Sequence, residues 1–219
     1  MSVPLEGTTA DWLGPEERRL AFELSPQEAF EYFWANVYGS GRWEQHTRRL
    51  IEKTLTRGDL FVDVGAWIGG VTLWALERGA EVIAVEPDPV AMAELRRHVP
   101  AGAEIWEGAV GVRSGTAALT ADPRLGFGKS VSRLAEEGEI DVRTWTLAEI
   151  LGERIPSLVK IDVEGYEIEL LPTIAPQLAE AGVPLQVELH GTLPERDWFS
   201  GYGEVRFPAN PHGALVALP

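Results

Sequence analysis

The sequence predicts a doubly wound α/β fold, in which a largely parallel sheet carries helices on both faces. Residues 60–64 (LFVDV) form an apolar run that passes into a glycine-containing turn, residues 65–70 (GAWIGG), and a helical pattern follows. A second apolar run, residues 81–85, ends at Glu86. Strand, tight turn, helix and parallel strand in this order form the unit that places a nucleoside at a helix N-terminus. Further apolar runs near residues 103–106 and 157–161 supply a third and a fourth strand.

The segment before this unit is predicted to be helical. Ser25 is a suitable N-cap for a helix that starts at Pro26, and apolar side chains recur at helical spacing at positions 29, 30, 33, 34 and 37. This aromatic stripe is expected to pack in the core, and the alternative is a lid over a substrate. Residues 39–41 (GSG) end the helix, and a second helix is predicted over residues 43–56.

The turn after the first strand restricts the kind of ligand. In a dinucleotide fold the second glycine of G-x-G-x-x-G lets a pyrophosphate lie against bare backbone, and Trp67 occupies that position here. A smaller, less charged group is therefore favoured at the turn. Glu86 lies about twenty residues beyond Gly65, the usual interval for a carboxylate that accepts both ribose hydroxyls. The ligand is expected to have free 2′ and 3′ hydroxyls and no 2′-phosphate.

The middle of the chain is expected to depart from a plain alternation of strand and helix. Asp88 and Pro89 provide the N-cap and the first-turn proline of a helix through residue 99. Turn signals then separate β-prone pieces at residues 116–119, 130–134 and 140–145. We therefore predict a β-hairpin or ribbon inserted near residues 110–145. Thr146 then caps a short helix, and residues 203–207 and 213–218 are predicted to form a final antiparallel hairpin.

Composition limits the class of protein. The 219 residues suit one domain over residues 1–219, with an N-terminal arm and helices over 1–57 and the sheet-forming core over 58–219. The 19 basic and 34 acidic residues give a net charge of −15, so a nucleic-acid partner is not expected. The chain has no cysteine, which excludes disulfides and thiol nucleophiles. Without a targeting segment or an apolar run of ~18 residues, a cytoplasmic protein with no membrane partner is expected. The oligomeric state stays open.

Three motifs resemble those of one known family. Residues 63–69 (DVGAWIG) with residues 86–88 (EPD) are similar to the first two motifs of class I S-adenosylmethionine (SAM)-dependent methyltransferases. Residues 158–167 (LVKIDVEGYE) look like the signature of the FkbM branch of that superfamily. Residues 43–47 (WEQHT) are similar to a W-E-x-x-T element that precedes the first strand in some FkbM members. The resemblance covers residues 42–191, most of the chain.

The resemblance implies a fold, a cofactor and a set of cofactor-binding residues. The fold is the Rossmann-like class I methyltransferase sheet, with strand order 3-2-1-4-5-7-6, and the cofactor is SAM. Glu44 and Thr47 would share one face of the second helix and face the cofactor, with Thr47 on its carboxylate, unless that face is exposed. Glu107 would accept the adenine amine, unless it lies in a solvent-exposed turn. The cofactor-binding residues expected are Glu44, Thr47, Asp63, Gly65, Ala66, Trp67, Gly69, Glu86, Pro87, Asp88, Glu107, Gly108, Ala109 and Asp162.

Acidic residues gather where the predicted strands end, which is where an open parallel sheet binds its ligand. A group of carboxylates is costly unless a positive charge lies among them, and the sulfonium of SAM would be one such charge. Lys160 shares a strand face with Asp162 and is another, most simply as a structural ion pair. The five acids at or near strand ends are Asp63, Glu86, Glu107, Asp162 and Glu188.

Methyl transfer to an alcohol needs an aligned acceptor and a group that takes its proton. Asp162 is the first candidate, and His190 is the second because the unperturbed pKa of histidine suits a general base near neutral pH, although a lone histidine is more often structural. Glu188 is the third. A site without metal is the primary expectation. The alternative is Mg²⁺ on Asp162, Glu188 and His190, in positions similar to the metal ligands of catechol O-methyltransferases, although K-I-D-V-E-G is not the metal motif of those enzymes.

We interpret the sequence as a SAM-dependent O-methyltransferase that acts on a hydroxyl of a small-molecule acceptor, a sugar or a natural product. The acceptor class is implied by the resemblance and not by individual residues. An NAD-dependent oxidoreductase is one alternative, against which Trp67 argues. A SAM-binding subunit without catalysis is another, and N-methylation is a narrower one.

Overall fold

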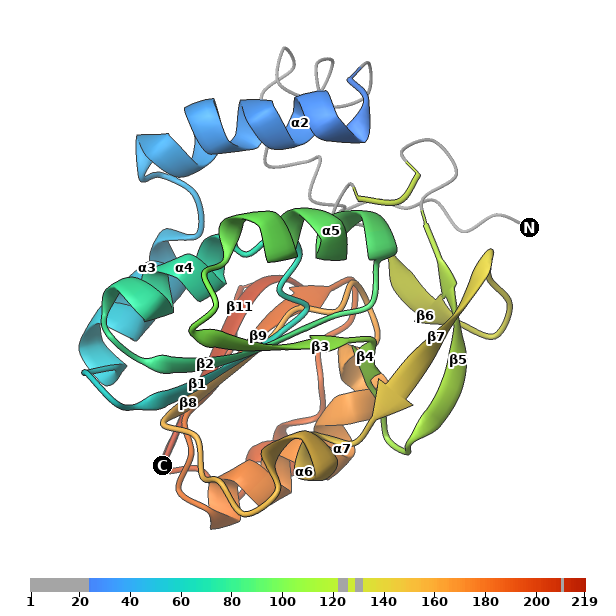
Figure 1. Ribbon diagram of the computed structural model, residues 1–219. Helices are drawn as coiled ribbons and strands as arrows, with labels where there is room; N and C mark the ends of the chain where they lie inside the picture. The colour runs from blue at the N-terminus through green and yellow to red at the C-terminus, as the bar shows by residue number, and fades with distance from the viewer. Residues whose placement is uncertain (1–23, 122–125, 129–131, 210) are drawn as a thin grey trace.

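In the computed structural model of the protein, the described residues are 24–121, 126–128, 132–209 and 211–219 (Figure 1). Predictions for the N-terminal arm before residue 24 and for residues 130–131 of the inserted ribbon lie outside them. Among the described residues, seven strands form the main sheet. In spatial order they are β3 (Ala103–Glu107), β2 (Glu81–Glu86), β1 (Leu60–Val64), β8 (Leu158–Ile161), β9 (Leu185–His190), β11 (His212–Leu218) and β10 (Glu204–Arg206).

The pairing of these strands fixes where a ligand can lie. Counted along the chain, the seven strands have the spatial order 3-2-1-4-5-7-6. β1 pairs in parallel with β2 on one side and with β8 on the other, so the strand order reverses at β1. β11 is antiparallel to both β9 and β10, which makes the predicted final hairpin. An open sheet of this kind binds ligands beyond the carboxyl ends of the strands, at the reversal.

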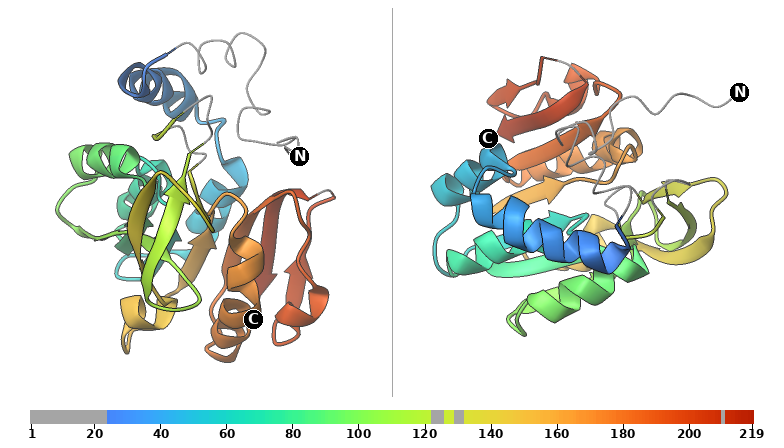
Figure 2. Two further views of the ribbon diagram at one scale, coloured as in Figure 1. Left: turned by 90° about the vertical axis from the view of Figure 1, so that its right-hand side faces the viewer. Right: turned by 90° about the horizontal axis from the view of Figure 1, so that it is seen from above.

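Helices cover both faces of the main sheet, and for this reason its central strands are largely apolar, with Asp63 in β1 and Lys160 in β8 as buried exceptions. Helices α3 (Gln45–Thr54), α4 (Gly70–Glu77) and α5 (Pro89–His98) lie on one face, and α6 (Leu147–Leu151) and α7 (Glu167–Glu180) lie on the other (Figures 1 and 2). Phe61 of β1 is buried with residues of α3 and α4, whereas Val62 is buried with residues of α7. The predicted α/β class is confirmed. None of the helices in the described part of the chain has the length and apolarity of a membrane span.

The N-terminal helix begins where the sequence predicts. Ser25 caps α2 (Pro26–Tyr32) in a capping box with Glu28. The helix continues through a π-helical turn, η2 (Phe33–Val37), and a 3-10 turn, η3 (Tyr38–Ser40), and Gly41 ends it at φ 66°. Phe30 and Phe33 are buried, with ring centroids 6.2 and 4.8 Å from that of Trp67. The aromatic stripe is therefore core, as predicted, and it packs beside the turn that follows β1.

The second helix differs from its prediction. α3 begins at Gln45 and not at Trp43, because Glu44 has φ 46° and takes the N-cap position outside the helix. Glu44 therefore lies outside the helix, but its carboxylate accepts the hydroxyl of Thr47 at 2.5 Å, so the two side chains lie together as predicted. Thr47 is fully buried, so the alternative of an exposed helix face is wrong.

A second sheet takes the place of the predicted hairpin. β5 (Gly115–Thr120) pairs antiparallel with β6 (Arg133–Ala135) and with β7 (Ile140–Trp145), which makes the expected ribbon. β4 (Ala109–Val110) follows β3 directly and pairs in parallel with β7. Gly108 links the two sheets at φ 146°, and a Cβ there would lie 2.4 Å from the carbonyl oxygen of Arg143. Glycine thus lets the inserted sheet join the end of β3 closely (Figure 1).

Candidate functional site

A cleft opens at the carboxyl ends of β1, β2 and β8, where the strand order reverses. It holds about 780 Å³ of space, part of it open to solvent. Its walls come from the turn after β1, the end of β2, the loop after β8, and strands β4 and β6 of the second sheet. Predicted cofactor-binding residues that line it are Gly65, Ala66, Trp67, Glu86, Pro87, Asp88, Ala109 and Asp162.

The turn after β1 brings three segments of the chain together. Gly65 has φ 77°, and its backbone N–H donates to the carbonyl of Val85 on β2. A Cβ on Gly65 would lie 1.7 Å from the carbonyl oxygen of Asp162. Only glycine fits, because the loop after β8 touches the backbone of the turn. Trp67 has φ 49°, and its N–H donates to the carboxylate of Glu86.

Glu86 ends β2 with its carboxylate buried in the wall of the cleft. Its two oxygens accept the backbone N–H groups of Trp67 and Asp88, each at 2.8 Å. Burial raises the pKa of Glu86 to about 8, and the two N–H groups oppose the rise only in part. A carboxylate has about four acceptor positions, so positions are left for donors that enter the cleft. Two adjacent ribose hydroxyls are donors of this kind.

The side chain of Asp88 connects the segment before β6 with the wall of the cleft. Its Oδ1 caps α5 by accepting two backbone N–H groups of the first turn, as predicted. Its Oδ2 accepts the N–H of Gly128 at 2.6 Å and the hydroxyl of Ser132 at 2.5 Å. The indole N–H of Trp67 donates to the carbonyl of Gly128 at 2.9 Å. Both oxygens of Asp88 thus accept hydrogen bonds from the protein itself. Those at Oδ2 hold Gly128 and Ser132 beside Asp88.

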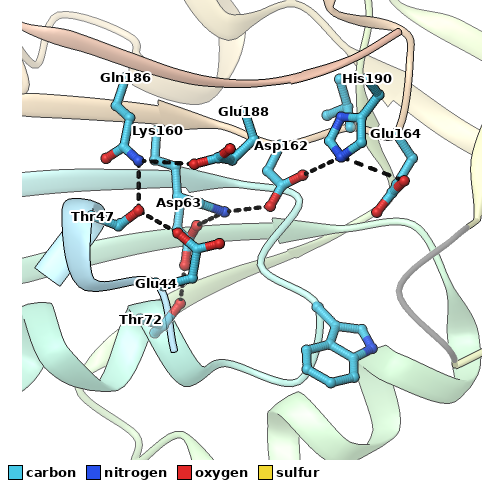
Figure 3. Close-up of polar contacts among 12 residues, drawn as sticks. Glu44, Thr47, Asp63, Thr72, Lys160, Asp162, Glu164, Gln186, Glu188 and His190 are labelled. Carbon is cyan, nitrogen blue, oxygen red and sulfur yellow. Dashed lines mark hydrogen bonds and ion pairs between the residues drawn. The ribbon is translucent and has the colours of Figure 1, made fainter. Parts of the chain in front are cut away.

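Lys160 is a buried cation among the strand-end carboxylates (Figure 3). Its side chain is 3% exposed, and its Nζ lies 3.1 Å from Asp162 Oδ2 and 3.7 Å from Asp63 Oδ1. Burial alone would lower the pKa of Lys160, but the charges of Asp162, Asp63 and Glu44 outweigh burial and raise it. Asp63 is fully buried, and its other oxygen accepts the hydroxyl of Thr72 at 2.7 Å. The ion pair predicted for Lys160 is confirmed.

A second row of polar side chains lies beside Lys160 (Figure 3). Thr47 donates to Glu44 Oε2 at 2.5 Å and accepts from Gln186 Nε2 at 2.5 Å. Gln186 Nε2 also lies 3.5 Å from Glu188 Oε1. Burial raises the pKa of Glu44. Burial, with repulsion from other carboxylates, raises the pKa of Glu188 to about 8. Both acids therefore keep a proton at higher pH than free carboxyl groups do.

His190 ends β9 among three carboxylates. Its Nδ1 lies 2.9 Å from Glu167 Oε1, and its Nε2 lies 3.5 Å from Glu164 Oε2 and 3.7 Å from Asp162 Oδ1. Burial would lower the pKa of His190, but the hydrogen bond to Glu167 and the charges of Glu164 and Asp162 raise it to about 10. His190 therefore holds its proton more tightly than an unperturbed histidine and must lose that proton before it can act as a base.

Asp162 connects the Lys160 group with His190. One of its oxygens faces Lys160 and the other faces His190, and the residue also lines the cleft. Burial alone would raise the pKa of Asp162, but the charges of Lys160 and His190 together with the Lys160 hydrogen bond lower it. The pKa of Asp162 is therefore held below its usual range beside the cleft, and its contact with a ligand stays a prediction.

Six predicted binding residues do not line the cleft, and three of these, Glu44, Thr47 and Asp63, belong to the polar groups described above. The other three have contacts elsewhere. The side chain of Glu107 is 64% exposed and pairs with Arg96 of α5 at 3.2 Å. The exposed alternative therefore describes Glu107 here, and its assignment to adenine stays a prediction. Gly69 is the N-cap of α4 at φ 93°, where a Cβ would lie 2.7 Å from Leu95. Gly108 serves the junction of the two sheets described above.

Some residues of the site were not among the sequence predictions. Gln186 lies two residues before Glu188 on β9, so a polar residue at this spacing in an apolar strand was an available signal. Glu164 and Glu167 stand in the motif after β8, but no local signal indicates that they meet His190. Ser132 and Arg133 line the cleft from the inserted segment, for which the sequence predicted a ribbon but no individual contacts.

The geometry defines a class of protein. A glycine turn leads from a buried strand into a helix, a buried carboxylate ends the next strand, and a cleft lies at the reversal of strand order. These features define a Rossmann-like α/β protein whose cleft lies where sheets of this kind bind their ligands. The chain belongs to the FkbM methyltransferase family, because the family described as "Methyltransferase FkbM domain" matches residues 63–207.

Individual relatives agree with this family. The chain is 27% identical over 160 residues to hexuronic acid methyltransferase AglP of Haloferax volcanii, over 71% of this chain and 66% of that protein. Methyltransferase FkbM from Methylobacillus flagellatus KT superposes with a TM-score of 0.52 at 13% identity, over 75% of this chain and 44% of that one. A TehB-like SAM-dependent methyltransferase from Corynebacterium glutamicum superposes with a TM-score of 0.50 at 16% identity, over 87% of this chain and 95% of that one. At such identities the two structures show the fold alone, and the chain matches less than two thirds of the first two relatives.

Proposed function

We propose that the protein is a SAM-dependent methyltransferase that methylates a hydroxyl of a small-molecule acceptor. The observation that carries the proposal is the carboxylate of Glu86, buried in the wall of the cleft, in a chain of the FkbM methyltransferase family. Membership of a methyltransferase family also argues against the alternative of an NAD-dependent oxidoreductase.

The residues present fit SAM. Glu86 has acceptor positions left for the ribose hydroxyls, and Ala66, Val85 and Ala109 give apolar wall beside it for a base. Asp63 Oδ1 is a buried acceptor that forms an ion pair with Lys160 Nζ at 3.7 Å but has no hydrogen-bond partner among the described residues. An ammonium group such as that of the methionine half is a donor of matching charge. Glu44 and Thr47 belong to the polar row beside Lys160, and they stay part of the proposed cofactor site.

The chain's own residues would act mainly by alignment. SAM supplies an electrophilic methyl group when it is bound. Asp162 faces the cleft and would accept a hydrogen bond from the acceptor hydroxyl, while Lys160 holds the Asp162 carboxylate in place. Because its pKa is low, Asp162 is a weak base and a good positioning group. Glu188, whose pKa is about 8, is a stronger base once it is ionised, but it keeps its proton near neutral pH and does not line the cleft.

The acceptor is proposed to be a sugar, in particular a sugar acid. AglP is by its name a hexuronic acid methyltransferase. In this chain Arg133 lines the cleft from β6 and offers a cation to an acceptor carboxylate. Trp43, Trp67 and Tyr166 also line the cleft, and aromatic faces of this kind pack well against sugar rings.

Calorimetry with S-adenosylhomocysteine tests the cofactor assignment. Glu86→Ala is expected to weaken binding by roughly 1 to 3 kcal/mol, the scale of leaving buried polar partners unpaired. Glu81→Ala, at the exposed start of the same strand, is the matched control and should bind as the unchanged chain does. Equal affinity of both variants, or preferred binding of NAD⁺, would contradict the proposal.

Methylation of sugar acids tests the enzyme assignment. The full chain with isotopically labelled SAM is expected to transfer label to hexuronic acids or their glycosides. Tight binding of SAM without transfer to any sugar or natural-product hydroxyl would favour the SAM-binding subunit. Label found on an amine would favour N-methylation.

A further inference from the structure

Three donor atoms at the ends of β8 and β9 face one another (Figure 3). They belong to Asp162, Glu164 and His190, and all lie within 4.8 Å of one another. Nε2 of His190 is 3.5 Å from Glu164 Oε2 and 3.7 Å from Asp162 Oδ1. A single ion with ligand bonds of about 2.1 Å holds its ligand atoms roughly 3 to 4 Å apart. The group is therefore close to the geometry of a coordination site before any side chain moves.

His190 is held as a metal-binding histidine is held. Its Nδ1 is bonded to Glu167 Oε1 at 2.9 Å, and Glu167 is 1% exposed. The same oxygen accepts the backbone N–H groups of Val163 and Gly165 at 3.2 and 3.1 Å. Glu167 cannot turn away without leaving those groups unpaired, so the ring presents Nε2 to Asp162 and Glu164. A buried carboxylate behind the far nitrogen is the usual support of a ligating imidazole.

The neighbours of Asp162 decide which acids belong to this group. Lys160 occupies Asp162 Oδ2 at 3.1 Å, which leaves Oδ1 on the side of His190. Glu188 lies with Gln186 in the other polar row, so the geometry favours Glu164 over Glu188 in the set Asp162, Glu188 and His190 considered from the sequence. Glu164 takes that place, and both Asp162 and Glu164 line the cleft.

We propose that Asp162, Glu164 and His190 bind one divalent transition-metal ion at the wall of the cleft. Two carboxylates with one imidazole suit Mn²⁺, Fe²⁺ or Zn²⁺, whereas Mg²⁺ prefers ligand sets made of oxygen. Ion binding stands on the geometry of these side chains and does not depend on the proposed function. Its role rests on that function: an ion here would hold the acceptor hydroxyl and make its proton easier to lose.

Titration of the full chain with Mn²⁺ alone tests the site, by calorimetry and by electron paramagnetic resonance of the free ion. One ion per chain is expected. Glu164→Gln and His190→Gln each remove a ligand and should weaken binding at least 100-fold, and Glu167→Gln should weaken it about 10- to 100-fold. Glu169→Gln makes the same change of charge at an exposed position of the same helix and should stay within a few-fold of the unchanged chain.

Each variant is first checked by circular dichroism and by its affinity for S-adenosylhomocysteine, so that a misfolded variant is not counted as a lost ligand. The inference is overturned if the unchanged chain takes up no Mn²⁺ below about 1 mM, or if the ligand variants bind as tightly as Glu169→Gln. Mn²⁺ uptake without any binding of S-adenosylhomocysteine would keep the metal site and refute the proposed function. The reverse result would refute the metal site alone.

Discussion

Replacing Lys160 with methionine tests whether this buried cation stabilises the strand-end carboxylates. Nζ lies 3.1 Å from Asp162 and 3.7 Å from Asp63. At an effective dielectric constant of about 20, a charge pair at such separations is worth roughly 4 to 5 kcal/mol. The free energy needed to bury the ammonium offsets part of this attraction. Methionine keeps most of the apolar part of the lysine side chain. Because Asp63 is fully buried and cannot regain water, the change should lower the free energy of unfolding by about 3 to 5 kcal/mol.

Urea denaturation at pH 7 measures this loss. Lys53→Met, an exposed lysine of α3, is the control and should change stability by less than about 0.5 kcal/mol. Adding Asp63→Asn to Lys160→Met removes the unpaired charge and should restore much of the stability, whereas Asp63→Asn alone should destabilise. The gap between Lys160→Met and the unchanged chain should also narrow at pH 5, because the unpaired Asp63 then takes up a proton. A loss below about 1 kcal/mol, or no rescue by Asp63→Asn, would refute the reasoning.

Three further outcomes are expected. Gly65→Ala should abolish binding of S-adenosylhomocysteine or prevent folding, because its Cβ would lie 1.7 Å from the carbonyl oxygen of Asp162; Gly58→Ala, at φ 87° with nothing near its Cβ, should cost only about 1 kcal/mol in a thermal melt. Burial, then repulsion from Glu44 and Asp162, raises the pKa of Glu188 to about 8. Between the unfolded pKa and pH 8 the folded state therefore binds the extra proton, and stability falls as pH rises. Glu188→Gln should be more stable than the unchanged chain by a few kcal/mol at pH 9 and nearly equal at pH 5, and equal denaturation profiles at both pH values would count against this. Asp162→Asn should lower kcat about 100-fold or more while S-adenosylhomocysteine still binds, and unchanged turnover would remove Asp162 from the mechanism.

Features set by neighbouring residues were predictable from the sequence. The caps at Ser25, Asp88 and Thr146 each involve a contact within four positions, and all three are present. The βαβ unit was equally readable, because two apolar runs and the glycines between them are local patterns. The start of α3 shows the limit of such patterns, since the backbone of Glu44 leaves the helical region where the sequence continues a helical pattern.

The sequence by itself determined the order of strands and helices, the tight turn after β1 and the presence of acids at several strand ends. Only the tertiary structure decided which of those acids act together. Thr47 and Gln186 bond across 139 positions, His190 meets Asp162 and Glu164 from another strand, and Glu107 faces Arg96 and the solvent. The reason is physical: a pKa or a coordination geometry depends on burial and on charges a few ångströms away, and residues remote in the chain supply both.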